Sequence, residues 1–140
     1  MNKIRSGLWV GDIWDAREGD TSRFDRVITI CQDSVESNVG CEYEHYPLSD
    51  GEPPSDAYNP GEFSSELFEQ AVSDIISSLE EGKTVFVHCH AGQSRSIMAC
   101  TAAIATIDSC SFDKAYEEVK QSRSTNPSQD LIELSKSYVN

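Results

Sequence analysis

Apolar residues recur at helical spacing over residues 64–81, which is the clearest amphipathic helix in the 140-residue sequence. Its apolar stripe consists of Leu67, Phe68, Ala71, Val72, Ile75, Ile76 and Leu79. We expect Ser64 or Ser65 to cap the first turn and Gly82 to end the helix. A helix with one apolar face needs a partner surface, so we expect it to pack on a sheet.

Three further helices are predicted in the second half of the chain. The apolar run over residues 97–105 predicts a buried helix that Ser96 opens. Ser111 is expected to cap a helix over residues 112–123, and Ser128 is expected to cap the last one.

Runs rich in Val, Ile and aromatic residues predict strands at residues 8–11, 24–31, 42–46 and 84–88. The second run shows little alternation of apolar and polar residues, which indicates burial on both faces, as in a parallel sheet. The fourth run is also expected to be buried. The predicted fold class is therefore α/β, with a central, mostly parallel β-sheet flanked by helices on both faces.

Two tryptophans and a histidine lie within the predicted elements. Trp9 belongs to the first strand, and Trp14 to a single helical turn over residues 12–17 that Asp12 is expected to cap. We prefer core packing as the interpretation of both indole rings. His45 is expected to be an exposed strand residue without a chemical role.

Residues 84–96, TVFVHCHAGQSRS, combine a strand, a polar loop and the start of a helix, with Cys89 beginning the loop and Arg95 ending it. Main-chain N–H groups before a helix lack intrahelical partners, and the positive end of the helix dipole lies there, so a phosphate suits this geometry. Gly92 permits close backbone approach, and Arg95 presents a planar fork to phosphate oxygens. The same positive field favours the nucleophilic thiolate of Cys89.

Residues 88–96, HCHAGQSRS, resemble the HCxxGxxRS signature of cysteine-dependent protein phosphatases, and the form HCxAGxSRS is most similar to the dual-specificity branch. The resemblance implies a phosphate-binding loop between a strand and a helix. It also implies a phosphocysteine intermediate on Cys89 and a hydrogen bond from Ser96 to the cysteine sulfur. The residues implied to bind the substrate phosphate are His90, Ala91, Gly92, Gln93, Ser94 and Arg95.

Two other interpretations of this stretch have less support. A buried structural cysteine does not explain why Gly92 and Arg95 follow at the spacing of the signature. A metal site made by His88, Cys89 and His90 is disfavoured, because neighbouring strand residues point to opposite faces and do not easily converge on one ion. We expect no metal and no cofactor, since the loop already supplies positive potential.

Expulsion of the leaving oxygen also requires a proton donor, which neither a cysteine nor an arginine of the loop supplies. The irregular segment over residues 48–63 holds the candidate carboxyl groups. By resemblance, Asp50 matches the general-acid aspartate of the family, and it is our first choice. The stretch between Asp50 and the next helix is longer than in small family members, so Asp56 and then Glu52 stay as alternatives.

The length predicts one domain over residues 1–140, which the resemblance implies is the catalytic domain, and we expect a monomer. There is no apolar run of about 18 residues and no apolar core of a signal peptide, so we expect no membrane partner. Five cysteines without CxxC pairs fit a reduced cytoplasm. The net charge of −13 disfavours nucleic acid.

The predicted activity is that of a protein phosphatase acting on phosphotyrosine, with phosphoserine and phosphothreonine left open because the sequence does not give the pocket depth. The partner is thus a phosphorylated protein. Rival functions are a catalytically inactive phosphate-binding module, a rhodanese-like sulfur transferase and a phosphatase of phosphoinositides, RNA or another non-protein phosphomonoester. The presence of Cys89, Arg95 and a candidate acid opposes the first rival. His88 and the Arg95–Ser96 pair oppose the second, and the acidic charge opposes the third.

The acidity supports two hypotheses of equal weight, namely adaptation to high salt, as in a halophilic archaeon, and an ordinary acidic cytosolic protein. At 1 M salt the Debye length falls to about 3 Å, which screens self-repulsion. The first hypothesis predicts that the thermal unfolding midpoint rises from dilute buffer to molar KCl. Circular dichroism across KCl concentrations measures it, and equal midpoints in both conditions contradict adaptation to salt.

Overall fold

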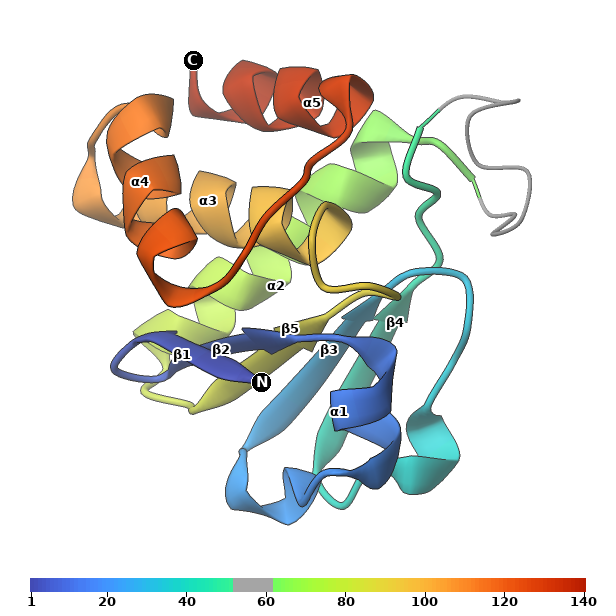
Figure 1. Cartoon of the computed structure of the whole chain (residues 1–140). Coiled ribbons are helices and arrows are strands. Elements are labelled where there is room, and N and C mark those ends of the chain that lie inside the picture. Colours follow the sequence, from blue (N-terminus) through green and yellow to red (C-terminus); the bar gives the residue numbers. More distant parts are fainter. Residues whose placement is uncertain (52–61) are drawn as a thin grey trace.

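A five-stranded sheet with helices on both faces forms the centre of the computed structural model, which describes residues 1–51 and 62–140 (Figure 1). The strands are β1 Asn2–Arg5, β2 Leu8–Gly11, β3 Arg26–Ile30, β4 Glu42–Tyr46 and β5 Val85–His88. The helices are α1 Ile13–Glu18, α2 Ser65–Glu80, α3 Arg95–Asp108, α4 Phe112–Ser122 and α5 Gln129–Val139. Two short 3-10 turns, Thr21–Arg23 and Glu36–Asn38, lie between α1 and β4.

The strand order is β1-β2-β5-β3-β4. Strands β2, β5, β3 and β4 run parallel, whereas β1 pairs antiparallel with β2 at the edge. The predicted α/β class and mostly parallel sheet are confirmed. Strand β1 was not predicted as a separate element. It folds back onto β2 through a turn that contains Gly7 at φ +86°, a conformation that glycine adopts without strain.

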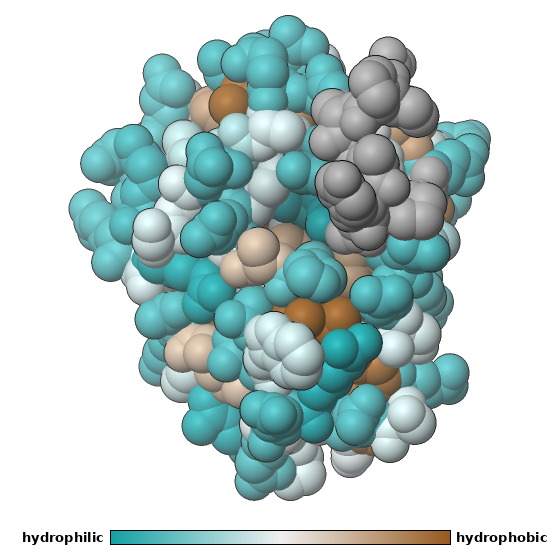
Figure 2. Space-filling view, turned by 45° about the vertical axis from the view of Figure 1, so that its right-hand side comes forward, coloured by the Kyte–Doolittle hydropathy of each residue, from teal (hydrophilic) through white to brown (hydrophobic). Residues whose placement is uncertain are grey.

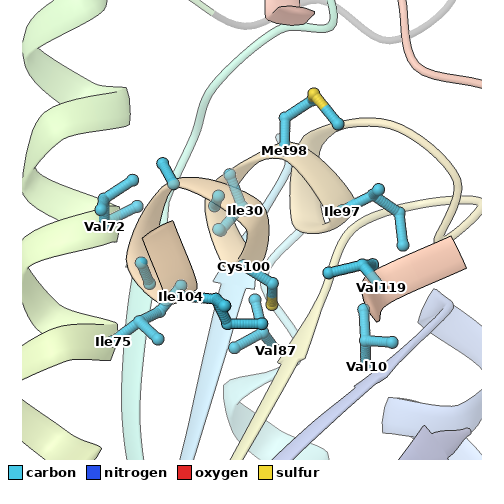
Figure 3. Packing of buried hydrophobic residues seen from close by; sticks show 14 of the residues in the cluster. Val10, Ile30, Val72, Ile75, Val87, Ile97, Met98, Cys100, Ile104 and Val119 are labelled. Atoms are coloured by element: carbon cyan, nitrogen blue, oxygen red, sulfur yellow. The ribbon is translucent and has the colours of Figure 1, made fainter. Parts of the chain in front are cut away.

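The central strand β5 is buried on both faces, and its alternating side chains enter two different cores. Val85 and Val87 join the larger core, which is covered by α2 and α3, while Phe86 joins the smaller core beneath α1. Figure 3 shows Ile104 of α3 between Ile75 of α2 and Val87 of β5. Strand β5 therefore holds its carboxyl end, where Cys89 follows, in a fixed position.

Helix α3 is enclosed by its neighbours, since it packs between the sheet and the helices α2, α4 and α5 (Figure 1). Every residue from Arg95 to Ala105 is buried. A helix that is apolar all round is typical of a core position, and this burial fixes the direction in which the N-terminus of α3 points.

The opposite face of the sheet is covered by α1 and an aromatic cluster. Phe24 stacks on Phe86 with ring centroids 5.3 Å apart, and Trp9 meets Phe24 edge-on at 5.8 Å. The prediction that Trp9 packs in the core is thus partly right, because its ring lies against this cluster. For Trp14 the prediction is wrong: the residue is 57% exposed, and the Arg17 guanidinium lies 5.5 Å from its ring centroid. A single helical turn leaves most of its positions open to solvent.

The amphipathic helix α2 is tied to the sheet by Asp74. Its carboxylate accepts hydrogen bonds from Nε and Nη2 of Arg26 on β3, both at 2.8 Å, and from Tyr46 on β4 at 2.7 Å. Ser78 donates a further bond at 3.1 Å. Burial opposes ionisation of Asp74, but these hydrogen bonds outweigh it, so the pKa of Asp74 lies below its usual value.

We predict that Asp74→Ala lowers the free energy of unfolding by about 2–3 kcal/mol, because Arg26 and Tyr46 lose a partly buried acceptor. A carboxyl with a lowered pKa stabilises the fold above its unfolded pKa of about 4, and this contribution is lost as the pH falls through the folded pKa. The difference between wild type and variant should therefore shrink below about pH 4 in urea unfolding curves. Glu69→Ala, an exposed change on the same helix, is the control, and an equal loss in both variants contradicts the prediction.

Candidate active site

The loop over residues 89–94 connects the end of β5 with the start of α3, as the sequence predicts. Cys89 comes directly after β5, and Arg95 is the first residue of α3. Ser94, rather than Ser96, precedes the first helical residue as its N-cap. Cysteine and arginine therefore stand at the two ends of one short loop, at the carboxyl edge of a parallel sheet, where open α/β sheets bind ligands.

Every main-chain carbonyl from Cys89 to Ser94 accepts a hydrogen bond. In chain order, the donors are His88 Nδ1 at 3.0 Å, Ile13 N at 3.0 Å, Arg123 Nη2 at 3.3 Å, Arg123 Nε at 2.8 Å, Asn126 N at 2.9 Å and Met98 N at 2.8 Å. The C=O and N–H of a trans peptide unit point in opposite directions, so the N–H groups of residues 90–95 point away from these donors, toward the concave side of the loop. Successive inward N–H groups form an anion-binding nest.

Gly92 is required by the packing beneath the loop. Its φ is +69°, and a Cβ at this position would lie 2.5 Å from the carbonyl oxygen of Gly11 and 2.7 Å from Nη2 of Arg123. Any side chain would therefore push the loop away from the end of β2 and from the arginine. Ala91 and Gln93, the neighbours of Gly92 in sequence, are exposed.

The thiol of Cys89 lies at the base of the loop, and the residue is only 2% exposed. Its Sγ is 3.1 Å from Oγ of Ser96, which is itself buried. A thiolate only accepts hydrogen bonds, so Ser96 is the donor whenever Cys89 is ionised. The structure thus brings Cys89 and Ser96 together, as the resemblance implied.

His88 supports the loop from within the sheet. Because the Cys89 carbonyl only accepts, Nδ1 of His88 carries the proton, and Nε2 then accepts from Oγ1 of Thr29 on β3 at 2.6 Å. Burial lowers the pKa of His88 to about 4, so the ring is neutral at physiological pH. His90 is exposed on the loop. Across residues 1–51 and 62–140, no cluster of three or more His, Cys, Asp or Glu side chains is arranged to hold a metal ion.

Arg95 joins the loop to the segment that carries the candidate general acid. It is 5% exposed, and its Nη1 donates to the carbonyl of Leu48 at 3.0 Å. Ser128 Oγ donates to the main-chain carbonyl of Asp50, which is two residues further on. The alternatives Asp56 and Glu52 lie outside the described residues. Asp50 is therefore held in a segment that contacts both Arg95 and the start of α5.

All five cysteines of the chain are free thiols. Burial, with a smaller effect of Cys89, raises the pKa of Cys31 to about 11. Burial also raises the pKa values of Cys100 and Cys41. These thiols stay protonated at neutral pH and are poor nucleophiles.

His45 differs from its predicted exposed state. It is half-buried, and its Nε2 lies 2.7 Å from the carbonyl oxygen of Cys31. Its ring links β4 to the segment that follows β3, so its role is structural.

Sequence reasoning did not find Arg123, Asn126 or Thr29 as parts of the site. Arg123 and Asn126 reach the loop from positions more than thirty residues away in sequence, and Thr29 bonds to His88 at the end of β5. Thr29 lies within the apolar run of β3, and for Arg123 and Asn126 the only sequence signal is that polar residues occur at the end of α4 and in the connection to α5. Such residues are common in exposed connections, so this signal points to no particular contact.

The surface turned toward the viewer in Figure 2 is predominantly hydrophilic, and its apolar residues occur in small separate groups. The net charge of −13 means that the cations of the loop region, Arg95 and Arg123, act against an acidic background. No helix of the described residues is long and apolar enough to span a membrane.

Comparison with known proteins agrees with the geometry. The model of the family "Dual specificity phosphatase, catalytic domain" matches residues 18–135. The chain is 30% identical to dual specificity protein phosphatase 22 of Homo sapiens over 131 residues, which cover 91% of this chain and 67% of that protein. It is 43% identical to dual specificity protein phosphatase 1 of Mus musculus over 60 residues, or 43% of this chain and 16% of that protein.

Among solved structures, human DUSP28 superposes with a TM-score of 0.81 at 19% identity, covering 99% of this chain and 95% of that chain. The likeness to DUSP28 shows a shared fold, whereas the family match and the 30% identical relative show common descent. The chain therefore belongs to the dual specificity phosphatases, within the cysteine-dependent protein phosphatases, and its function is that of a protein phosphatase.

Proposed function

We propose that residues 1–140 act as one catalytic domain that hydrolyses phosphomonoesters on protein tyrosine through a phosphocysteine intermediate. The observation that carries this proposal is the position of the Cys89 thiol beneath a loop whose carbonyls are all bonded outward. Such a loop offers its N–H groups to the three equatorial oxygens of a phosphoryl group, where the charge of the transition state resides.

In the first step the Cys89 thiolate attacks phosphorus, and the phosphorus–oxygen ester bond breaks as the sulfur–phosphorus bond forms. The inward N–H groups of residues 90–95 and the guanidinium of Arg95 bind the phosphoryl oxygens. Asp50, in its protonated form, gives its proton to the leaving oxygen. The support for Asp50 is its place two residues after Leu48, whose carbonyl bonds to Arg95.

In the second step water attacks phosphorus, and the sulfur–phosphorus bond breaks. Asp50, now ionised, accepts a proton from the water, and the electron pair of the broken bond returns to the sulfur of Cys89. Ser96 donates a hydrogen bond to the departing thiolate, which its Oγ approaches at 3.1 Å. The products are inorganic phosphate and the regenerated thiolate.

The substrate is a phosphorylated protein, as the family implies. We further propose a cytoplasmic monomer that binds neither nucleic acid nor membranes. The support is the charge of −13, which repels polyanions, and the five irregularly spaced cysteines without CxxC pairs.

Cys89→Ser should abolish hydrolysis of p-nitrophenyl phosphate in buffer containing a metal chelator, with a loss of at least about 10⁴-fold in kcat because the covalent step is removed. Cys31→Ser serves as the control, since that thiol lies outside the proposed chemistry. Absence of wild-type turnover, at low and molar salt, together with retained binding of vanadate would favour a phosphate-binding module instead.

Asp50→Asn should slow substrates with poor leaving groups far more than those with good ones, because only the former need a proton. With phenyl phosphate as the poor leaving group we expect a loss of about 10²–10⁴ in kcat, and a much smaller loss with 2,4-dinitrophenyl phosphate. Steady-state kinetics of Asp50→Asn, Asp56→Asn and Glu52→Gln on both substrates separate the candidates. If only Asp56→Asn or Glu52→Gln shows this selective loss, Asp50 is not the general acid.

A further inference from the structure

We propose that Arg123, at the end of α4, is the positioning residue that holds the active-site loop in its anion-binding conformation. This inference rests on the proposed function, because it concerns how the same loop binds phosphoryl groups. Arg123 lies 31 residues after Gly92 in sequence, and its Nε donates to the Gly92 carbonyl at 2.8 Å. Its Nη2 lies 3.3 Å from the preceding carbonyl, that of Ala91.

The two carbonyls that Arg123 binds lie at the tip of the loop, where the main chain has no regular structure of its own. The other carbonyls of the loop accept from main-chain N–H groups or from the adjacent His88 ring. Ala91 and Gly92 instead depend on one side chain. If either peptide unit rotated, its carbonyl would replace an N–H on the concave side and present negative charge to the phosphoryl oxygens. Binding by Arg123 opposes that rotation.

Two adjacent carbonyls require a donor of a particular shape. The guanidinium is planar, and its Nε and Nη2 donors form a rigid fork. A lysine ammonium is a point charge on a flexible stem, so it binds one of the carbonyls at the expense of the other. Arg123 also packs closely against the loop, since a Cβ added at Gly92 would lie 2.7 Å from its Nη2.

Contacts on its other edge fix the guanidinium of Arg123. Nη1 donates to Oδ1 of Asn2 on β1 at 2.8 Å, and Nη2 lies 3.7 Å from Oδ2 of Asp12, the N-cap of α1. The side chain is 16% exposed, so solvent screens these contacts only in part. Arg123 thereby connects the start of the sheet, the cap of α1 and the end of α4 to one loop.

The test compares Arg123→Met and Arg123→Lys with wild type, well below the unfolding midpoint of every variant. We expect Arg123→Met to lower kcat/KM for p-nitrophenyl phosphate and to weaken inhibition by orthovanadate, each by about 10–100-fold, because the N–H groups lose their alignment. Arg123→Lys keeps the charge without the fork and should restore less than half of the loss on a logarithmic scale.

Arg5→Met is the matched control. Arg5 also joins distant elements, donating to Asp108 at 2.7 Å and Glu118 at 2.6 Å, but it does not contact the loop. It should lower the unfolding midpoint while leaving vanadate inhibition and kcat/KM within about twofold of wild type. If Arg123→Met also lowers only the midpoint, or if Arg123→Lys restores full vanadate affinity, the positioning role is wrong.

Two further measurements keep this inference separate from the proposed catalysis. Calorimetric titration of orthovanadate into the Arg123 variants measures anion binding without turnover, so the role of Arg123 can be judged even if the wild type proves inactive. If Arg123→Met does not fold, Arg123→Gln keeps one amide donor and should show an intermediate loss of vanadate affinity. Unchanged affinity in a folded Arg123→Gln variant would overturn the proposal.

Discussion

A loop offers consecutive N–H groups to a single anion only when other groups bind its carbonyls, because the two ends of each trans peptide unit point in opposite directions. In this chain the carbonyls that must be bound are the six from Cys89 to Ser94, and each of them accepts a hydrogen bond. The donors come from the start of α1, the end of α4 and the α4–α5 connection as well as from the loop's own neighbours. The packing of these elements around β5 is therefore part of the site.

Local sequence patterns were sufficient to predict most of the fold. The bounds of β4, Glu42–Tyr46, and the cap of α2 agree with the prediction, since side-chain alternation and serine capping act within a few residues. Strand β1 was missed because its sequence, NKIR, has no strong β-forming run, and its pairing with β2 decides its conformation. The exposure of Trp14 was missed for a related reason, since one helical turn does not determine which residues a neighbour covers.

Part of the site could likewise be predicted from local sequence, whereas the rest depends on contacts between residues that are distant in sequence. The signature residues are adjacent in sequence, so their grouping around one loop followed from the strand–loop–helix pattern. Arg123 and Asn126 reach the loop carbonyls, and Thr29 reaches the ring of His88, only after α4 and the sheet have packed. A hydrogen-bonding group has no periodicity, and many residues can supply one, so no sequence pattern distinguished these three from other polar residues of the chain.

The acidic charge of the chain is compatible with binding a phosphate dianion because the two effects act over different distances. At physiological ionic strength exposed charges are screened beyond about 8 Å, whereas buried cations and dipoles are screened much less. Arg95 is 5% exposed, and the burial of α3 aims its positive end at the loop. In the proposed mechanism the acidic surface slows the approach of a phosphorylated protein, while the N–H groups, the helix and the buried guanidinium set the affinity of the docked phosphoryl group. Selection on the surface charge, for salt tolerance or solubility, is therefore largely independent of selection on the loop.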